Sequence, residues 1–306
     1  MKLTKFETKN MIYTLGETLL DIIFKSDGSL SATPGGAMLN VAVSLARRKT
    51  PVTLISELGD DLTGSRIIGF LLDEGISSKC ITRYQSGKTS LALAFLDKDA
   101  KPSYNFYKTY PERRKLITDM RFTNNDYLLF GSVYSLDPDI RKDVVAIINQ
   151  AKKNGTTIIY DPNIRHAYHL DNTLFRQAVQ ENIATAHIIK GSDEDFTNLF
   201  GPGNPDTWAE LIRKTNKNAT VIVTMGQNGC AGYVNNRIIK IPAKKIKAVS
   251  TVGAGDAFNA GMLYTMNRTG EKPDILSDNQ WNSILETATD FAAEVCSREE
   301  NYVGKI

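Results

Sequence analysis

The sequence predicts an α/β fold in which a mostly parallel central sheet is covered by helices on both faces. Short apolar runs of strand length alternate with longer segments of helical periodicity along most of the 306 residues. Continuous apolar strands are typical of parallel sheets, which are buried on both faces. The hydrophobic content of 42% is enough for one large core. Residues 1–306 are therefore expected to form a single domain.

Helix signals follow the expected strands in the first half of the chain. The strand at 11–16 ends on a glycine, and an apolar helix begins at Gly36. Asp137 and Pro138 are an N-cap residue and a first-turn proline, and they open a helix that continues to Lys153. The expected pairs of strand and helix are 11–16 with 36–48, 52–57 with 61–73, and 127–131 with 137–153.

The same alternation continues in the second half, where a hairpin is also indicated. Asn235 and Asn236 favour a tight turn and divide the segment 230–242 into two strands. The stretches 18–32 and 89–106 alternate as strands do, without helices between them, and form insertions into the main pattern. The remaining expected elements are strands at 156–160, 186–190 and 219–225 and helices at 192–200, 255–267 and 281–298.

The composition favours a small-molecule partner. Thirty-seven Lys and Arg balance thirty-four Asp and Glu to a formal charge of +3, which predicts neither a nucleic-acid surface nor a membrane surface. No signal peptide or membrane-spanning run is present, and we expect a cytoplasmic protein. Cys80, Cys230 and Cys296 lack the spacing of a zinc site or a disulfide framework, which fits a reducing compartment.

The segment Thr251–Gly261, T-V-G-A-G-D-A-F-N-A-G, is the most informative motif of the chain. Its glycines allow backbone N–H groups to approach an anion, and the helix expected to follow adds its unpaired N–H groups. In the functional interpretation, Gly253, Ala254 and Gly255 hold the transferred phosphoryl group, and Asp256 accepts a proton from the attacking hydroxyl. In the alternative, Asp256 only stabilises the helix, by about 0.3–1 kcal/mol.

This motif resembles the C-terminal signature of the ribokinase-like sugar kinases, the PfkB family. The family's second signature is similar to T-P-G-G-A-M-L-N-V-A at 33–42, so both signatures are present and in the right order. No Gly-Lys-Ser/Thr of a Walker loop follows, and Phe258 stands where a dinucleotide motif has its third glycine. The resemblance implies a ribokinase-like fold, in which the insertions 18–32 and 89–106 form a small β-sheet lid over the sugar.

The resemblance also implies ATP-dependent phosphorylation of a small sugar. G-E-T-L-L-D at 16–21 and D-P-N-I-R at 161–165 resemble the fructokinase-like branch, which implies fructose as the acceptor. Arg165 is then expected to bind phosphate oxygens or the sugar and to assist catalysis. Aromatic residues at 104–110, with Arg113 and Arg114, either line the sugar pocket or pack the lid. The residues expected to hold the sugar are Asp21, Gly35, Gly36, Asn40 and Arg165.

The nucleotide side is implied by weaker similarities. The segments 190–195 and 224–229 resemble the family's magnesium-organising segment and a glycine turn along the nucleotide, and Asp195 is expected to bind Mg²⁺ through water. The last helix is expected to contribute the adenine pocket. The residues expected to contact ATP are Ser192, Thr224, Gly226, Gly229, Ala254, Gly255, Ala293 and Cys296.

Several alternatives stay open at this stage. The acceptor is either fructose or, in the same family, 2-keto-3-deoxygluconate or ribose, with a nucleoside more distant. A sugar- or nucleotide-binding protein without turnover is the alternative outside the kinases, although the complete G-A-G-D argues against it. Ser250 replaces the aspartate of family members that use a monovalent cation, which makes potassium activation doubtful. An exposed edge of the lid sheet would suit a homodimer.

Overall fold

A computed structural model describes residues 10–24, 28–96, 102–164 and 172–306 of the chain. Its main sheet has nine strands among these residues, in the order β13-β12-β11-β10-β9-β8-β1-β4-β5, and it is parallel except at β12 and β13. The predicted α/β class is confirmed. The strands are β1 (Ile12–Leu15), β4 (Val52–Gly59), β5 (Ile81–Tyr84), β8 (Tyr127–Gly131), β9 (Thr157–Asp161), β10 (Ile188–Ser192), β11 (Thr220–Thr224), β12 (Cys230–Val234) and β13 (Arg237–Ile241).

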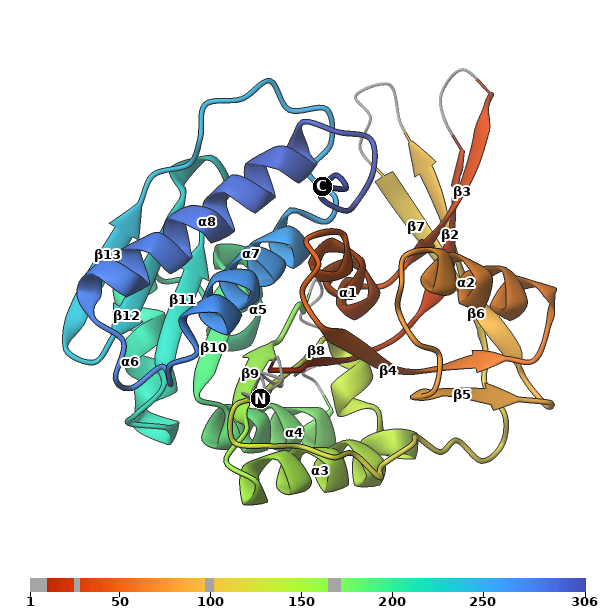
Figure 1. Cartoon of the computed structure of the whole chain (residues 1–306), viewed down its shortest axis with the longest axis horizontal. Coiled ribbons are helices and arrows are strands. Elements are labelled where there is room, and N and C mark those ends of the chain that lie inside the picture. The colour runs from red at the N-terminus through yellow and green to blue at the C-terminus, as the bar shows by residue number, and fades with distance from the viewer. Residues whose placement is uncertain (1–9, 25–27, 97–101, 165–171) are drawn as a thin grey trace, which may run out of the picture.

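Helices cover both faces of this sheet, as Figure 1 shows. One group packs on one face of the sheet, and the other group packs on the opposite face. Each group encloses its own hydrophobic core, because the parallel strands are apolar on both sides. The first group is α1 (Ala37–Arg47), α2 (Leu62–Asp73), α7 (Ala254–Thr269) and α8 (Asp278–Cys296), and the second is α3 (Pro138–Lys153), α4 (Thr173–Thr185), α5 (Asp193–Phe200) and α6 (Pro205–Thr215).

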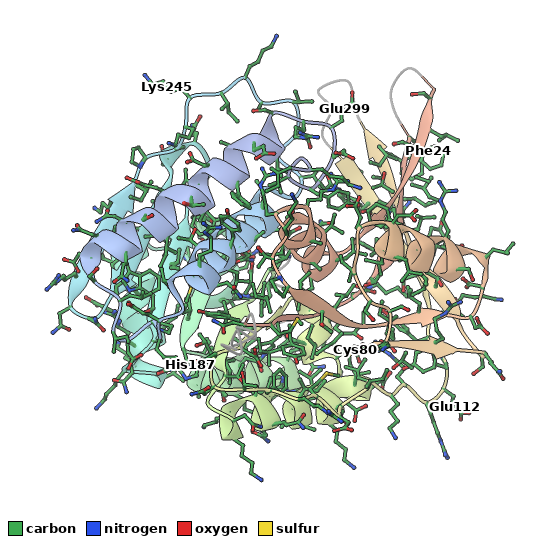
Figure 2. All side chains as sticks on the ribbon, in the orientation of Figure 1. Phe24, Cys80, Glu112, His187, Lys245 and Glu299 are labelled. Atoms are coloured by element: carbon green, nitrogen blue, oxygen red, sulfur yellow. The ribbon has the colours of Figure 1, made fainter. Side chains whose placement is uncertain are left out.

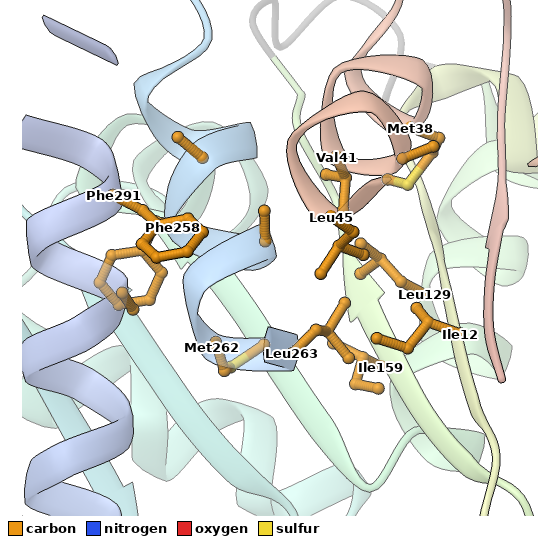
Figure 3. Packing of buried hydrophobic residues seen from close by; sticks show 14 of the residues in the cluster. Ile12, Met38, Val41, Leu45, Leu129, Ile159, Phe258, Met262, Leu263 and Phe291 are labelled. Carbon is orange, nitrogen blue, oxygen red and sulfur yellow. The ribbon is translucent and has the colours of Figure 1, made fainter. Parts of the chain in front are cut away.

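The packing of α1 and α7 fixes the position of the two sequence signatures, since each signature runs into one of these helices. Val41 and Leu45 of α1 and Leu263 of α7 lie over Ile12 and Ile159 of the sheet (Figure 3). All five side chains are fully buried. Burial of a large aliphatic side chain contributes about 1.5–3 kcal/mol. The two helices are therefore held side by side on the same face.

Four strands form a separate sheet, which we call the lid, in the order β3-β2-β6-β7. These strands come from the two insertions that broke the main pattern of the sequence. They extend past the expected bounds of 18–32 and 89–106, to Gly35 and Thr109. The lid projects from the main sheet beside α1 and α2 (Figure 1). Its strands are β2 (Leu19–Phe24), β3 (Leu30–Gly35), β6 (Lys88–Leu96) and β7 (Pro102–Thr109).

Capping and turn residues explain where several helices and strands begin or end. Asp137 caps α3 by accepting a hydrogen bond from the N–H of Asp139, and Pro138 follows it as predicted. The hairpin of β12 and β13 turns at Asn235 and Asn236, also as predicted. β5, α4 and α6 were not predicted. Across the described ranges, no helix combines the length and the apolarity that crossing a membrane requires.

Candidate active site

Several of the predicted site residues that the structure describes lie at the carboxyl ends of the parallel strands. β1 lies between β4 and β8, so the order of the strands along the chain reverses there. Open α/β sheets bind their ligands at such a switch point, outside the carboxyl ends. Asp161, Ser192 and Thr224 end β9, β10 and β11, respectively. The N-terminus of α7 comes to the same edge of the sheet, because Asn259 of α7 donates a hydrogen bond to Asp161.

The anion loop consists of Gly253, Ala254, Gly255 and Asp256. Gly253 is the N-cap residue of α7 and has a left-handed φ of 80°, which glycine adopts without steric cost. In the described structure α7 has no side-chain capping hydrogen bond, and the N–H of Ala254 makes only a 3.3 Å hydrogen bond to the carbonyl of Thr251. The first turn of α7 can therefore bind an anion through backbone N–H groups. Together with the partial positive charge of the helix end, they form a site for an anion.

Asp256 contacts Asn40, which belongs to the other sequence signature. The amide Nδ2 of Asn40 donates a 2.8 Å hydrogen bond to Oδ2 of Asp256. Asn40 is buried on α1, and its Oδ1 has no hydrogen-bond partner among the described residues. A buried polar atom without a partner costs about 1–3 kcal/mol. The contact joins the two signatures, and the unpartnered Oδ1 is suited to a hydroxyl donor.

Asp21 lies against Gly35 at the base of the lid. A Cβ atom at Gly35 would be 2.0 Å from Oδ2 of Asp21, so only glycine allows this approach. Gly36 follows as the N-cap residue of α1, which places Asn40 one turn further along the helix. The structure thus brings together Asp21, Gly35, Gly36 and Asn40. Arg165 lies outside the described residues.

The sequence did not predict the role of Lys190, which lies beneath the anion loop. Its Nζ is 3.0 Å from Oδ2 of Asp161, and both side chains are buried. Asn259 donates to the same carboxylate oxygen at 2.6 Å, while Oδ1 of Asp161 has no partner among the described residues. A Cβ atom at Gly255 would be 3.1 Å from Nζ of Lys190. The ammonium group therefore lies directly beside the loop.

Lys190 keeps its charge despite its burial. Burial alone lowers the pKa of Lys190, but the carboxylates of Asp161, Asp195 and Asp256 outweigh this effect and raise the pKa above its ordinary value. Burial raises the pKa of Asp161, against the effect of the ammonium group. Lysine is rarely buried unless it is paired. The sequence signal for a role of Lys190 was therefore its position within an apolar strand.

Comparison with known proteins identifies the family. The sequence matches the pfkB family carbohydrate kinases over residues 9–302. The chain belongs to the pfkB family of carbohydrate kinases. It is 28% identical to the fructokinase of Vibrio alginolyticus over 277 residues, which are 89% of this chain and 90% of that protein. The enzyme is accordingly an ATP-dependent phosphotransferase.

Solved structures agree with the fold. The fructokinase of Vibrio cholerae O395, in a form with fructose, ADP and calcium bound, has a TM-score of 0.84 and 22% identity and covers 96% of this chain and 95% of its own. The aminoimidazole riboside kinase of Salmonella enterica has a TM-score of 0.79 and 21% identity, covering 95% and 94%. The ribokinase-like arrangement of the main sheet and the lid is confirmed.

Asp195, which the sequence assigned to the nucleotide side, is a helix-capping residue of α5. Its Oδ2 accepts hydrogen bonds from the N–H and the hydroxyl of Ser192, at 2.8 and 2.7 Å. It is nearly fully buried, whereas Glu194 is exposed. Ser192 is paired with Thr224 on the next strand. Asp195 thus has the fixed position that a carboxylate needs to order water molecules.

The two glycines after Thr224 differ in their surroundings. A Cβ atom at Gly226 would meet no atom within 4 Å, whereas one at Gly229 would be 2.0 Å from the carbonyl oxygen of Ile241. Packing therefore requires glycine at position 229, whereas Gly226 faces open space. Ala293 and Cys296 are half-buried on α8, and the carbonyl of Cys296 accepts a 2.7 Å hydrogen bond from Val249, in the segment before the anion loop.

The donor set fits a magnesium ion that is carried by the phosphates. The described residues contain no group of three or more His, Cys, Asp or Glu side chains that would hold a metal ion. Mg²⁺ usually keeps several water molecules and is bound by one or two carboxylates together with substrate phosphates. The unpartnered Oδ1 of Asp161 and the fixed carboxylate of Asp195 match that requirement.

Proposed function

We propose that this carbohydrate kinase acts in the cytoplasm and transfers the γ-phosphoryl group of ATP to a hydroxyl group of fructose. The observation that carries the proposal is the 2.8 Å hydrogen bond between Asn40 and Asp256. It supports Asp256 as the base, because the two sequence signatures meet at this contact. Relatives named fructokinases support fructose as the acceptor.

Asp256 is the proposed base. The acceptor oxygen forms a bond to the γ-phosphorus while the bond from this phosphorus to the bridging oxygen of ADP breaks, and Asp256 takes the hydroxyl proton. Asn40 orients the carboxylate from one side. Asp21, Gly35 and Gly36 hold the sugar, and the lid above them excludes water, which would otherwise compete as acceptor.

The charge that develops on the phosphoryl group is stabilised from two directions. The N–H groups of Gly253, Ala254 and Gly255 act from the loop, and the ammonium group of Lys190 acts from beneath it. Asp195, through water, is the proposed contact of Mg²⁺, which neutralises phosphate charge when it is bound. Arg165 stays a proposed contact of phosphate or sugar. The nucleotide lies along Ser192, Thr224 and Gly226 toward Ala293 and Cys296, with Gly229 shaping the turn.

The lid favours a neutral acceptor over an acidic sugar. Lys108 of β7 forms an ion pair with Glu17, with 2.7 Å between their charged atoms. Arg114 is buried in ion pairs with Glu57 and Asp137. These two cations are therefore not available to a carboxylate or phosphate on the acceptor. Fructose carries no such group, whereas 2-keto-3-deoxygluconate does.

An aromatic ring on the lid suits the apolar side of a sugar. Asp21 is in register with Ala92 on β6, and Ala92 is in register with Phe106 on β7. Residues in register on neighbouring strands share one face of a sheet, so Phe106 lies on the same face as Asp21. The ring of Phe106 is 55% exposed and stacks with Tyr104. Asp21 is thus proposed to bind hydroxyl groups while Phe106 covers the C–H groups.

The lid edge is also the proposed site of a homodimer. β3 and β7 are its edge strands, and exposed edges pair readily with a second chain. Leu30 on β3 and Tyr107 on β7 are more than half exposed. The wild type should sediment as a dimer, and Tyr107→Asp should sediment as a weaker dimer, because the added charge lies at the lid edge. A wild type that sediments as a monomer at all concentrations would contradict the proposal.

The test is ADP release with Mg-ATP across fructose, ribose, 2-keto-3-deoxygluconate and aminoimidazole riboside. Asp256→Asn should lower kcat on fructose by about 10²–10⁴-fold, with ATP binding unchanged. The matched control is Asp139→Asn, because Asp139 is also an aspartate in the first turn of a helix and is exposed. The control should keep the wild-type rate. A loss below tenfold in Asp256→Asn would remove it as the base, and turnover on another sugar alone would reassign the acceptor.

A further inference from the structure

Three consecutive residues near the end of the chain contact both halves of the site. The chain leaves α8 and returns to α1, and its C-terminus lies beside α1 in Figure 1, where the N–H of Ile306 donates to the carbonyl of Arg47 at the end of that helix. Asn301, Tyr302 and Val303 are each at least nine-tenths buried. Figure 2 labels Glu299 at the start of this return. We call residues 301–303 the clasp.

Asn301 packs against the anion loop. A Cβ atom at Gly253 would be 2.8 Å from the carbonyl oxygen of Asn301 and 3.1 Å from its Cβ. Gly253 is the N-cap residue of α7, where φ is left-handed. A shift of the clasp by a few tenths of an ångström would therefore be transmitted to the residue that begins the loop.

Tyr302 holds the sugar-binding loop. Its hydroxyl donates a hydrogen bond to the carbonyl oxygen of Pro34, which immediately precedes Gly35. The ring lies 5.1 Å from the guanidinium carbon of Arg47 and packs against Phe70. Burial first, and then the negative charge of Asp21, raise the pKa of Tyr302, so the hydroxyl stays protonated and remains a donor.

Val303 fixes the clasp to α1, the helix that carries Asn40. Its N–H donates to the hydroxyl of Ser44 at 3.4 Å, and its carbonyl accepts from Arg47 at 3.2 Å. Arg47 is held in turn by Glu74, with which it forms a buried ion pair at 2.9 Å. The clasp thus has a rigid support on α1. Its two other contacts reach Gly253 of the anion loop and Pro34 of the sugar-binding loop.

We propose that Tyr302 is a positioning residue, which through the clasp keeps the sugar-binding loop in register with the anion loop. This inference rests on the proposed function, because register matters only if a sugar hydroxyl must meet a phosphate at Asp256. A misplacement of about 1 Å can cost 10²-fold in rate. Tyr302 touches neither substrate in this account and acts through Pro34.

The experiment compares two variants that lose the same kind of contact. Tyr302→Phe removes the hydrogen bond to Pro34 and keeps the ring. Tyr127→Phe is the matched control, because Tyr127 is equally buried and its hydroxyl donates to the carbonyl of Met266 at 3.0 Å, at the other end of α7. A merely structural role predicts the same loss of thermal stability and the same kinetics for both variants.

Tyr302→Phe should raise the KM for fructose by roughly three- to tenfold and leave the KM for ATP unchanged, whereas Tyr127→Phe should change neither. Amide hydrogen exchange without ligands gives a second readout. The amides of 35–36 and 253–255 should exchange about two- to tenfold faster in Tyr302→Phe only. Unchanged exchange at both loops, or equal kinetic effects in the two variants, would overturn the proposal. A wild type that phosphorylates no sugar would instead refute the proposed function, while the exchange data still decide the role of the clasp.

Discussion

Two buried ion pairs have nearly the same burial but different surroundings. Lys190 pairs with Asp161 beneath the anion loop, with side chains 4% and 2% exposed, and Arg114 pairs with Glu57 between the lid and the main sheet, with side chains 1% and 2% exposed. The guanidinium of Arg114 donates to Glu57 from Nε and Nη2 and to Asp137 from Nη1. The ring of Tyr110 covers its face at 3.6 Å.

The two cations differ in how many carboxylates they bind. Arg114 forms ion pairs with two carboxylates, Glu57 and Asp137, and stacks on the ring of Tyr110, so its charge is neutralised by protein groups. Among the described residues, the contacts of Nζ of Lys190 comprise one hydrogen bond, to Asp161. An ammonium group has three donors, and the loop beside this one is built for an anion. Equal burial therefore does not mean an equal role.

Between the two ion pairs, the larger effect on kcat is expected for Lys190→Met. Loss of the ammonium group should lower kcat by about 10²–10³-fold, since a charge that stabilises the transferring phosphoryl group is removed. It should also lower the free energy of unfolding by about 3–5 kcal/mol, because Asp161 is left buried without its cation. Steady-state kinetics well below the melting temperature and urea unfolding measure the two effects separately. A kcat within tenfold of the wild type would contradict the role given to Lys190.

Arg114→Met tests most directly whether the two ion pairs differ in function. It should lower the free energy of unfolding by about 3–5 kcal/mol as well, because Glu57 loses its buried partner. The folded protein should keep its kcat within about threefold, since this charge faces no substrate. If kcat falls as far as in Lys190→Met, the two ion pairs do not differ in function.

The sequence predicted the main sheet better than it predicted the two ion pairs. Continuous apolar strands and capped helices depend on local residues, and these elements are confirmed. β5 is a four-residue edge strand, I-T-R-Y, with too little periodicity to stand out, and α4 and α6 have polar residues at about half of their positions. For Arg114 the sequence left both the sugar pocket and lid packing open, and its burial against Glu57 favours packing.

The site was predictable where a motif carried it. Asp256 and Asn40 each belong to a signature, but their contact depends on the packing of α1 against α7. Lys190 gave only the signal of a charge within an apolar strand. The clasp gave no signal, because Asn301 and Tyr302 meet Gly253 and Pro34 only after the chain has folded back from α8. Contacts between distant segments are set by tertiary packing.

Asp61 is a partly exposed carboxylate at the lid, and we expect it to contribute less stability than the two buried ion pairs. Asp61 caps α2 through the N–H of Gly64 and binds the N–H and the hydroxyl of Thr89 on β6. Burial alone raises the pKa of Asp61, but these hydrogen bonds outweigh it and hold the pKa below its ordinary value. The stability that Asp61 contributes is then present above a pH of about 4 and is lost as the pH falls through the lower pKa of the folded state.

Asp61→Ala should therefore lower the free energy of unfolding by about 0.5–2 kcal/mol at neutral pH, and the difference from the wild type should shrink below a pH of about 4. The matched control is Asn204→Ala, which removes an uncharged cap from α6. Its effect should not depend on pH. Urea unfolding between pH 3 and pH 7 measures both, and parallel pH profiles for the two variants would show that the charge of Asp61 contributes nothing.

The smallest effect is expected for potassium, since position 250 has no carboxylate and the carboxylate of Glu300 is already paired with two arginines. Ser250 offers a hydroxyl, and its Oγ accepts a 3.2 Å hydrogen bond from the N–H of Val252. The carboxylate of Glu300 is held by Arg47 at 3.0 Å and by Arg298 at 3.1 Å. Exchanging potassium for sodium at constant ionic strength should therefore change kcat by less than about twofold. Activation by tenfold or more would mean that a cation, rather than the packing of Asn301 on Gly253, sets the position of the loop.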